Sequence, residues 1–149
     1  MTLIPKFPTK LHSDAAEIIR DYFLPNPNVD TVLIVNSCAR GTAVPESDLD
    51  FAILVKPGTS ITEIQNMEKA WQKFNQIQAT LLAFKQSSRF SHLHIDIISG
   101  TYTPTILEVG VASDYFEIEI GNHICYSVPM NNAGPYFQNL QKIWLPYYN

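Results

Sequence analysis

Cysteine and long apolar runs are both scarce in this sequence. Cys38 and Cys125 are the only cysteines among 149 residues, too few and too far apart for a disulfide framework or a zinc site. Residues 1–8 lack the apolar core of a signal peptide, and no apolar run approaches the ~20 residues that a membrane-spanning helix needs. We therefore expect a cytoplasmic protein that does not enter a membrane.

Charge is sparse as well. Charged residues make up 16% of the chain, and the formal net charge is −4. Because there is no surplus of basic residues, we do not expect binding to duplex DNA or RNA, although a small anionic substrate can still bind at a local cationic spot. The hydrophobic content of 46% and the length of 149 residues predict one folded domain over residues 1–149.

Apolar residues at helical spacing predict three helices. The first covers residues 13–23, with Ser13 as its N-cap. A long amphipathic helix follows the capping box of residues 60–63 and carries its apolar face to Leu81. The last helix starts at Pro135, because proline favours the first helical turn. Its expected buried side consists of Tyr136, Phe137, Leu140, Ile143 and Trp144.

Short apolar runs and alternating apolar and polar residues predict the strands. Two of them surround a turn of small residues, and three more follow the long helix. The predicted strands cover residues 32–35, 48–55, 91–98, 115–120 and 124–128. This order of strands and helices predicts a single α+β domain in which helices flank a mixed β-sheet.

Residues 36–55 carry the clearest chemical signal. Asp48 and Asp50 open an apolar strand, and residues two apart on a strand point to the same face. Two carboxylates this close repel each other unless a cation lies between them, and Mg²⁺ prefers such oxygen ligands together with substrate phosphates. A solvated turn over residues 45–48 is the plainer explanation, but it leaves Asp50 unexplained. The pair therefore predicts a metal–nucleotide site.

The same segment resembles the signature of the DNA polymerase beta-like nucleotidyltransferase superfamily. In the minimal nucleotidyltransferases this signature runs Gly-Ser-x-Ala-Arg-Gly-x-Ala-x-x-x-Ser-Asp-(Ile/Leu)-Asp. The matching positions here are Ser37, Ala39, Arg40, Gly41, Ala43, Ser47, Asp48, Leu49 and Asp50. The resemblance implies the nucleotidyltransferase fold. It also implies a transferase that moves a nucleoside monophosphate, with AMP as the expected group, from a nucleoside triphosphate to an acceptor and releases pyrophosphate.

The resemblance further implies a third carboxylate on a later strand, and Asp96 fits this position. Asp48, Asp50 and Asp96 are then the catalytic residues and the ligands of Mg²⁺, with Mn²⁺ as an alternative. Asp96 would also take or orient the proton of the acceptor hydroxyl. His92 and His94 share the face of Asp96. We favour a solvated face over metal binding for both histidines, and either can line the acceptor pocket.

The turn before the carboxylates is the predicted phosphate site. The expected nucleotide-binding residues are Asn36, Ser37, Arg40, Gly41 and Ser47. Asn36 stands where the family usually has glycine, and asparagine is the best-tolerated substitute if the backbone there needs a positive φ. Cys38 and Val44 stand where many minimal members carry arginine, which lowers the positive charge available to phosphates.

The resemblance leaves the acceptor and the partners open. A nucleoside triphosphate is the expected substrate, and the acceptor is a protein or a small molecule. A small helical partner protein, as in toxin–antitoxin pairs, and a homo-oligomer are both alternatives. The rival hypothesis is a nucleotidyltransferase-fold module that binds nucleotide or a partner protein without turnover. Asn36 in place of glycine favours the module, whereas the three carboxylates favour an enzyme.

Overall fold

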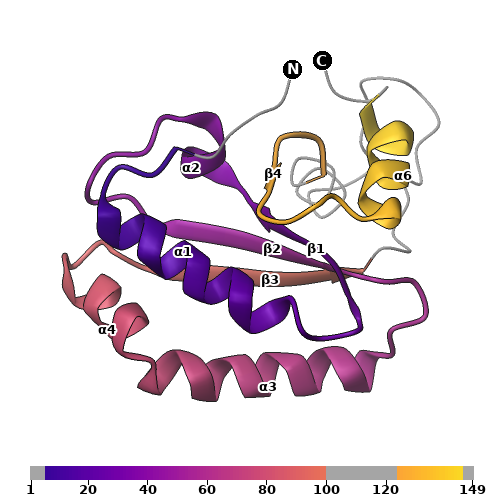
Figure 1. The fold of residues 1–149 in the computed structure, drawn as a ribbon, viewed down its shortest axis with the longest axis horizontal. Helices are drawn as coiled ribbons and strands as arrows, with labels where there is room; N and C mark the ends of the chain where they lie inside the picture. Colours follow the sequence, from indigo (N-terminus) through magenta and orange to yellow (C-terminus); the bar gives the residue numbers. More distant parts are fainter. Residues whose placement is uncertain (1–5, 100–123, 146–149) are drawn as a thin grey trace.

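The computed structural model describes residues 6–99 and 124–145, which include a single four-stranded sheet (Figure 1). The strand order is β3-β2-β1-β4. β1 is antiparallel to β2 and to β4, whereas β2 and β3 are parallel, so the sheet is mixed. The strands are β1 (Val29–Ile34), β2 (Leu49–Val55), β3 (Leu93–Ser99) and β4 (Val128–Pro129).

Helices flank this sheet, and a short one joins its two central strands (Figure 1). The described helices are α1 (Lys10–Phe23), α2 (Asn36–Arg40), α3 (Ile61–Ile77), α4 (Ala79–Gln86) and α6 (Pro135–Trp144). The predicted α+β class with a mixed sheet flanked by helices is therefore confirmed. Residues 115–120, predicted as a strand, lie outside the described residues, and the extent of the domain over residues 1–149 stays a prediction.

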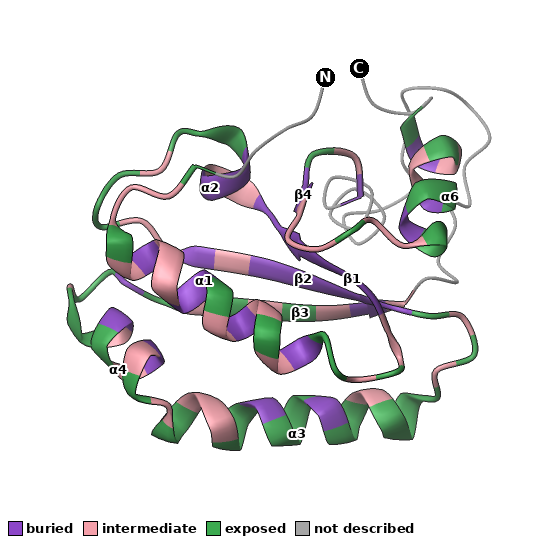
Figure 2. Cartoon of the chain, viewed as in Figure 1, coloured by how far each residue is buried: buried purple, intermediate pink, exposed green. Residues whose placement is uncertain are grey.

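The sheet buries apolar side chains on both faces. Phe51 of β2 belongs to the same buried cluster as Trp71 of α3, together with residues of α1 and α4. Leu54 of β2 and Ile98 of β3 belong to a second cluster with Trp144 of α6. Figure 2 shows β2 buried along most of its length and α3 exposed on its outer side. Because strand side chains alternate, the two clusters lie on opposite faces of the sheet.

The strand ends differ from the predicted ones by a few residues. β1 starts at Val29 instead of residue 32, because Val29 pairs with Val55 at the end of β2. β2 starts at Leu49, so Asp48 lies immediately before the strand. β3 begins at Leu93 instead of residue 91, where its pairing with Leu49 begins. Pairing between strands sets these limits, and alternation along one strand does not reveal its partner's length.

α1 begins earlier than predicted. Ser13 was expected to cap it, but Thr9 is the N-cap, and Ser13 lies inside the helix. The backbone of Thr9 is extended, and its hydroxyl oxygen accepts a hydrogen bond from the His12 N–H at 3.1 Å. Threonine and serine are both able to cap a helix. Capping by Thr9 adds a turn to the helix, and this turn contains the buried His12.

The predicted long helix is interrupted at Gln78. The capping box of Ser60 and Glu63 starts α3 as expected, but α3 ends at Ile77, and a separate helix, α4, follows. Gln78 is extended (ψ 125°), and its side-chain oxygen accepts the Leu81 N–H at 2.8 Å. The turn brings Leu81 into the core cluster that also contains residues of α1. Glutamine is an uncommon N-cap, so the sequence carries no strong signal for this break.

The strand predicted over residues 124–128 is also wrong in extent. Ile124 and Cys125 are helical, and only Val128 of that range joins the sheet. Beyond the short strand, the Asn131 side chain accepts the Val32 N–H at 2.9 Å. A side-chain oxygen thus takes the place of a backbone carbonyl, and the strand needs no further residues there.

α6 starts at Pro135 as predicted. Phe137, Leu140 and Trp144 are buried, and Ile143 packs against them in part. Tyr136, expected on the buried side, is instead 36% exposed. The buried residues follow the i, i+3, i+7 spacing of one helix face, and Tyr136 lies one position off that face.

Candidate functional site

The site begins where β1 ends. The chain enters α2 at Asn36 with φ 60°, in the left-handed region, and leaves it at Gly41 with φ 74°. Glycine adopts this conformation freely, and asparagine tolerates it better than most residues. Asn36 therefore adopts the positive φ that would explain a preference for glycine at this position.

Four of the predicted site residues line one cavity of about 370 Å³. Asp48, Asp50 and Asp96 contribute carboxylates, and Asn36 lies beside them. Its full lining is Val35, Asn36, Asp48, Asp50, Phe51, His94 and Asp96. The other predicted nucleotide-binding residues, namely Ser37, Arg40, Gly41 and Ser47, are not among those that line this cavity.

The parallel pairing of β2 and β3 explains why these side chains meet. Asp50 is the register partner of His94, and Ala52 is the partner of Asp96. Since side chains alternate along a strand, Asp50, His94 and Asp96 point to the same face of the sheet, the one that α6 covers further along. The alternation predicted for β3 thus places Asp96 beside the aspartate pair.

Asp48 is held in place by the start of β3. One carboxylate oxygen, Oδ1, accepts the backbone N–H of His92 at 3.1 Å. The other, Oδ2, lies 3.2 Å from Nε2 of His94. The Asp48 and His94 side chains are 36% and 57% exposed, so this ion pair by itself contributes little to stability. Its consequence is geometric, because it brings an imidazole nitrogen to the carboxylates.

Asp48, Asp50 and His94 together offer one ligand atom each within 4.8 Å of one another. Two carboxylate oxygens and an imidazole nitrogen are a donor set that suits a divalent cation. Asp96 lines the same cavity but is not in this group. From the sequence we favoured a solvated face over metal binding for His94, and left open that it lines the acceptor pocket. The sequence feature that pointed His94 towards the site was the strand face that it shares with Asp96.

The turn that precedes Asp48 is held by its own hydrogen bonds. The Val44 N–H donates to Oγ of Ser47 at 2.8 Å, and the Ser47 N–H donates to the Val44 carbonyl at 2.8 Å. Ser47 therefore shapes the turn through both its side chain and its backbone. Arg40 is exposed at the end of α2, and the Ser37 carbonyl accepts the N–H of Gly41.

His12 supports this turn from α1 and was not identified from the sequence. It is 1% exposed, and its Nε2 lies 2.8 Å from the Ser47 carbonyl oxygen. A carbonyl only accepts, so Nε2 carries a proton and donates it. The other ring nitrogen pairs with the Thr9 hydroxyl at 2.7 Å. The ring also meets Phe84 edge-on, with centroids 4.8 Å apart. A single histidine on an amphipathic helix gives no sequence signal for such a role.

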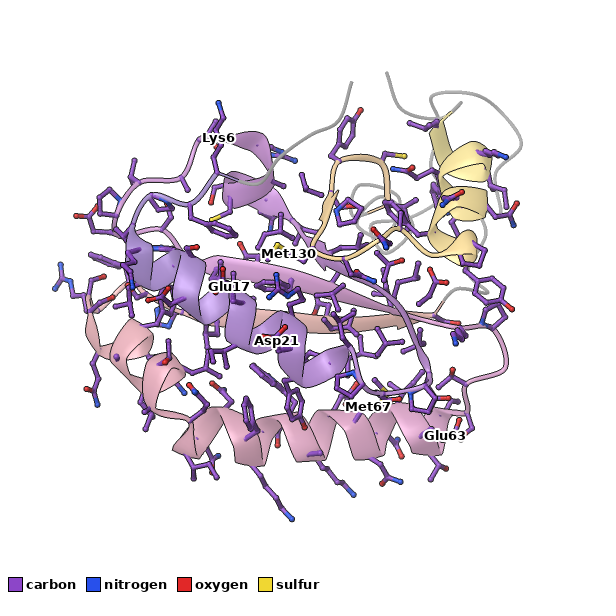
Figure 3. The ribbon with its side chains drawn as sticks, in the orientation of Figure 1. Lys6, Glu17, Asp21, Glu63, Met67 and Met130 are labelled. Carbon is purple, nitrogen blue, oxygen red and sulfur yellow. The ribbon has the colours of Figure 1, made fainter. Side chains whose placement is uncertain are left out.

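Lys6 lies against the outer side of the α2 turn (Figure 3). Its backbone N–H donates to the Cys38 carbonyl at 3.1 Å. A Cβ at Gly41 would lie 3.2 Å from Cδ of Lys6, in addition to the strain of the positive φ. Gly41 is therefore favoured by its backbone conformation, and a larger side chain there would also have to displace the flexible Lys6 side chain.

Burial and charge make the Cys38 thiol a weak acid. Burial raises the pKa of Cys38 to about 11, and the negative charge of nearby Asp50 adds to the rise. Cys38 is 1% exposed. These observations support a small buried residue at this position over a reactive thiol.

Comparisons with known proteins give the family. The family model described as "Polymerase beta, Nucleotidyltransferase" matches residues 17–100, which is more than half of the chain. The chain belongs to the polymerase beta nucleotidyltransferase family. Every predicted site residue of this nucleotidyltransferase domain, from Asn36 to Asp96, lies within the matched range.

Other comparisons add less. A crystal structure from Sulfolobus solfataricus, of a protein provisionally described as a nucleotidyltransferase, is 22% identical with a TM-score of 0.30. The match covers 60% of this chain and 66% of that protein's length. No curated protein matches the sequence. No helix within residues 6–99 and 124–145 of this polymerase beta family member is long and apolar enough to cross a membrane.

Proposed function

We propose that this protein is a divalent-metal-dependent nucleotidyltransferase. In this proposal it moves a nucleoside monophosphate, AMP in the first instance, from a nucleoside triphosphate to a hydroxyl group of a protein or small-molecule acceptor, and releases pyrophosphate. Family membership supports the reaction class. The observation that carries the proposal is the cavity itself, which gathers Asp48, Asp50 and Asp96 at adjacent strands.

The carboxylates have separate tasks in the proposed reaction. The acceptor oxygen forms a bond to the α-phosphorus while the bond from that phosphorus to the pyrophosphate oxygen breaks. Asp48 and Asp50 would hold Mg²⁺ or Mn²⁺, which when bound neutralises phosphate charge and lowers the pKa of the attacking oxygen. Asp96 lies further along β3 on the same face and takes the proton from the acceptor hydroxyl.

The nucleotide would lie across the end of the sheet that holds α2. Among the predicted nucleotide-binding residues, Asn36 lines the cavity together with the carboxylates, and it would contact phosphate or sugar. Roles in binding for Ser37, Arg40, Gly41 and Ser47 rest on the family resemblance, and the structure supports a shaping role for Gly41 and Ser47 in the turn.

The identity of the acceptor is the second part of the proposal. Asp96 and His94 are exposed on β3, so an acceptor group on a large molecule can reach them. We propose a protein, including a small helical partner or a second copy of the chain, ahead of a free small molecule.

The test combines labelled nucleotides with carboxylate variants. The purified protein would be incubated with Mg²⁺ or Mn²⁺ and each radiolabelled nucleoside triphosphate, with and without cell lysate, while pyrophosphate release is followed. We expect metal-dependent transfer, and a loss of at least about a hundredfold in Asp50→Asn, the scale on which single electrostatic groups act in catalysis. Glu46→Gln is the matched control, because this exposed carboxylate near the site does not line the cavity.

Two outcomes would contradict the proposal. Transfer that is unchanged in Asp50→Asn, with a folded protein by circular dichroism, would place the chemistry elsewhere. Nucleotide binding by calorimetry without transfer to any acceptor in the lysate would instead support the alternative of a binding module without turnover.

A further inference from the structure

His94 stands in a place that a metal ligand would occupy. It is the register partner of Asp50 on the neighbouring parallel strand, and its Nε2 lies 3.2 Å from Oδ2 of Asp48. Ligands at right angles around a first-row divalent ion, with bonds of about 2.0–2.2 Å, lie about 3 Å apart. The spacing of these two atoms is therefore that of neighbouring ligands on one ion.

The surroundings orient these ligand atoms. The His92 N–H binds Oδ1 of Asp48 and leaves Oδ2 directed at His94. Backbone donors that fix a carboxylate in this way are typical of the supporting residues of metal sites. All three residues of the group line the cavity, so the ligand atoms meet at a solvent-accessible hollow where an ion can enter.

We propose that His94 is a metal ligand together with Asp48 and Asp50, and that the site prefers Mn²⁺ or a similar borderline ion over Mg²⁺. Imidazole nitrogen binds Mn²⁺, Fe²⁺, Co²⁺ and Zn²⁺ more readily than the hard Mg²⁺ ion, which favours an all-oxygen shell. Asp96, outside the three-residue group, then serves the acceptor. This assignment rests on the proposed function for its role in transfer, but the metal binding itself is separate from it.

The plainer alternative is a surface ion pair between His94 and Asp48. Both side chains are partly exposed, and such pairs are common and weak. The two alternatives differ in one measurable respect. The nitrogen of a coordinated imidazole couples to the electron spin of the bound ion and appears in its spectrum, whereas the nitrogen of an ion pair does not.

The test uses the whole protein and Mn²⁺ alone, without nucleotide. We expect pulsed electron paramagnetic resonance of the bound Mn²⁺ to show modulation from a coordinated imidazole nitrogen. His94→Ala should remove this signal and weaken Mn²⁺ binding by at least about tenfold, since even the loss of a supporting residue around a metal costs that much. Mg²⁺ binding should change much less, so the preference for Mn²⁺ should disappear.

His92→Ala is the matched control. The His92 ring centroid lies 6.2 Å from that of His94, and His92 is not among the residues that line the cavity. Alanine keeps the backbone N–H that binds Asp48, so this variant should keep both the nitrogen signal and the Mn²⁺ affinity.

The outcomes separate this inference from the proposed function. Mn²⁺ binding without the nitrogen signal, equally tight binding in His94→Ala, or no Mn²⁺ binding by the unaltered protein would overturn the assignment of His94. In the first two cases, a loss of transfer in Asp50→Asn would still support the proposed transferase, and its metal site would then have oxygen ligands alone. A nitrogen signal in a protein that transfers nothing would overturn the transferase and leave His94 as a ligand.

Discussion

The Asp30 carboxylate caps α6, although it lies on β1: its Oδ2 accepts the backbone N–H of Phe137 at 3.1 Å. The same oxygen accepts the Thr31 hydroxyl at 2.8 Å, and that hydroxyl accepts the Gly134 N–H at 2.9 Å. Orphan donors at the start of α6 are thus satisfied by the strand on which the helix packs. The contact fixes the helix over the sheet face that carries the site.

Removing this cap should loosen α6. We expect Asp30→Ala to lower the free energy of unfolding by about 2 kcal/mol, because buried N–H donors lose their acceptor. Asp21→Ala is the control, since Asp21 is exposed and forms an ion pair with the neighbouring Arg20; its effect should stay within about 0.5 kcal/mol. Urea denaturation of both variants measures the difference, and equal effects would contradict the capping role.

A side chain at Gly134 should act on the same contact. A Cβ there would overlap the carboxylate of Asp30, at a separation that real structures do not tolerate. We expect Gly134→Ala to destabilise the protein through Asp30, so that it costs much less in the Asp30→Ala background. A double-mutant cycle tests this coupling, and strictly additive effects would show that the two residues act independently.

Replacing His12 should affect metal binding from a distance. His12→Leu retains an apolar side chain against Phe84 but leaves the Ser47 carbonyl without its donor. We expect a loss of about 1–3 kcal/mol in stability and weaker Mn²⁺ binding, because Ser47 directly precedes Asp48. His12→Gln keeps an N–H donor and should recover part of the Mn²⁺ affinity. If His12→Leu binds Mn²⁺ as tightly as the unaltered protein, the turn does not depend on His12.

Substitutions at Asn36 should separate backbone strain from side-chain contacts. With φ at 60°, alanine should cost about 1–2 kcal/mol in the left-handed region. Asn36→Gly should fold with nearly unchanged stability, since glycine accepts this conformation. Denaturation curves for both variants test the strain, and an alanine variant as stable as the asparagine protein would contradict it. Nucleotide affinity of Asn36→Gly then reports what the asparagine side chain does in the cavity.

The free energy of unfolding should fall in alkaline solution because the two cysteine thiols ionise more readily in the unfolded chain. Burial raises the pKa of Cys38 and of Cys125 from 9.0 to about 11, with Asp50 adding to the rise at Cys38. Between these values the unfolded chain loses thiol protons that the folded chain keeps, so unfolding becomes more favourable as pH rises. This part of the stability is fully present below pH 9 and is lost towards pH 11.

The measurement is the free energy of unfolding as a function of pH. Cys38→Ala should flatten its decline between pH 9 and pH 11, and alkylation of the native protein by iodoacetamide should be slow at neutral pH. A decline of the same slope in Cys38→Ala would mean that other groups account for it.

Much of the fold could be predicted from local patterns. The capping box of Ser60 and Glu63 and the proline start of α6 were found where expected, because such signals act within one turn of helix. The start of α1 and the break at Gln78 were missed. At α1 two residues are able to cap, and the burial of His12 favours the earlier one. At Gln78 an uncommon cap is used, and the turn buries Leu81. The pattern of a single helix contains neither of these contacts.

The site divides in the same way. Alternation along one strand predicted that His94 and Asp96 share a face, and the family signature identified Asp48 and Asp50 as the main pair. Alternation does not tell which of two residues on that face lies nearer to Asp48. The register of β2 against β3 decides this, and it places His94 next to Asp48. The supporting contact of His12 with Ser47 joins residues 35 positions apart and had no sequence signal.

The sequence by itself determined the family and predicted the carboxylates of the site, because both depend on residue types at fixed short spacings. It also raised a positive φ as one reason why position 36 would favour glycine, and the structure shows this conformation at Asn36, with φ at 60°. The tertiary structure alone decided which groups meet: His94 with Asp48, His12 with Ser47, and Asp30 with the start of α6. Each of these contacts depends on strand register or helix packing, which many distant residues fix together through the burial of the core on both faces of the sheet.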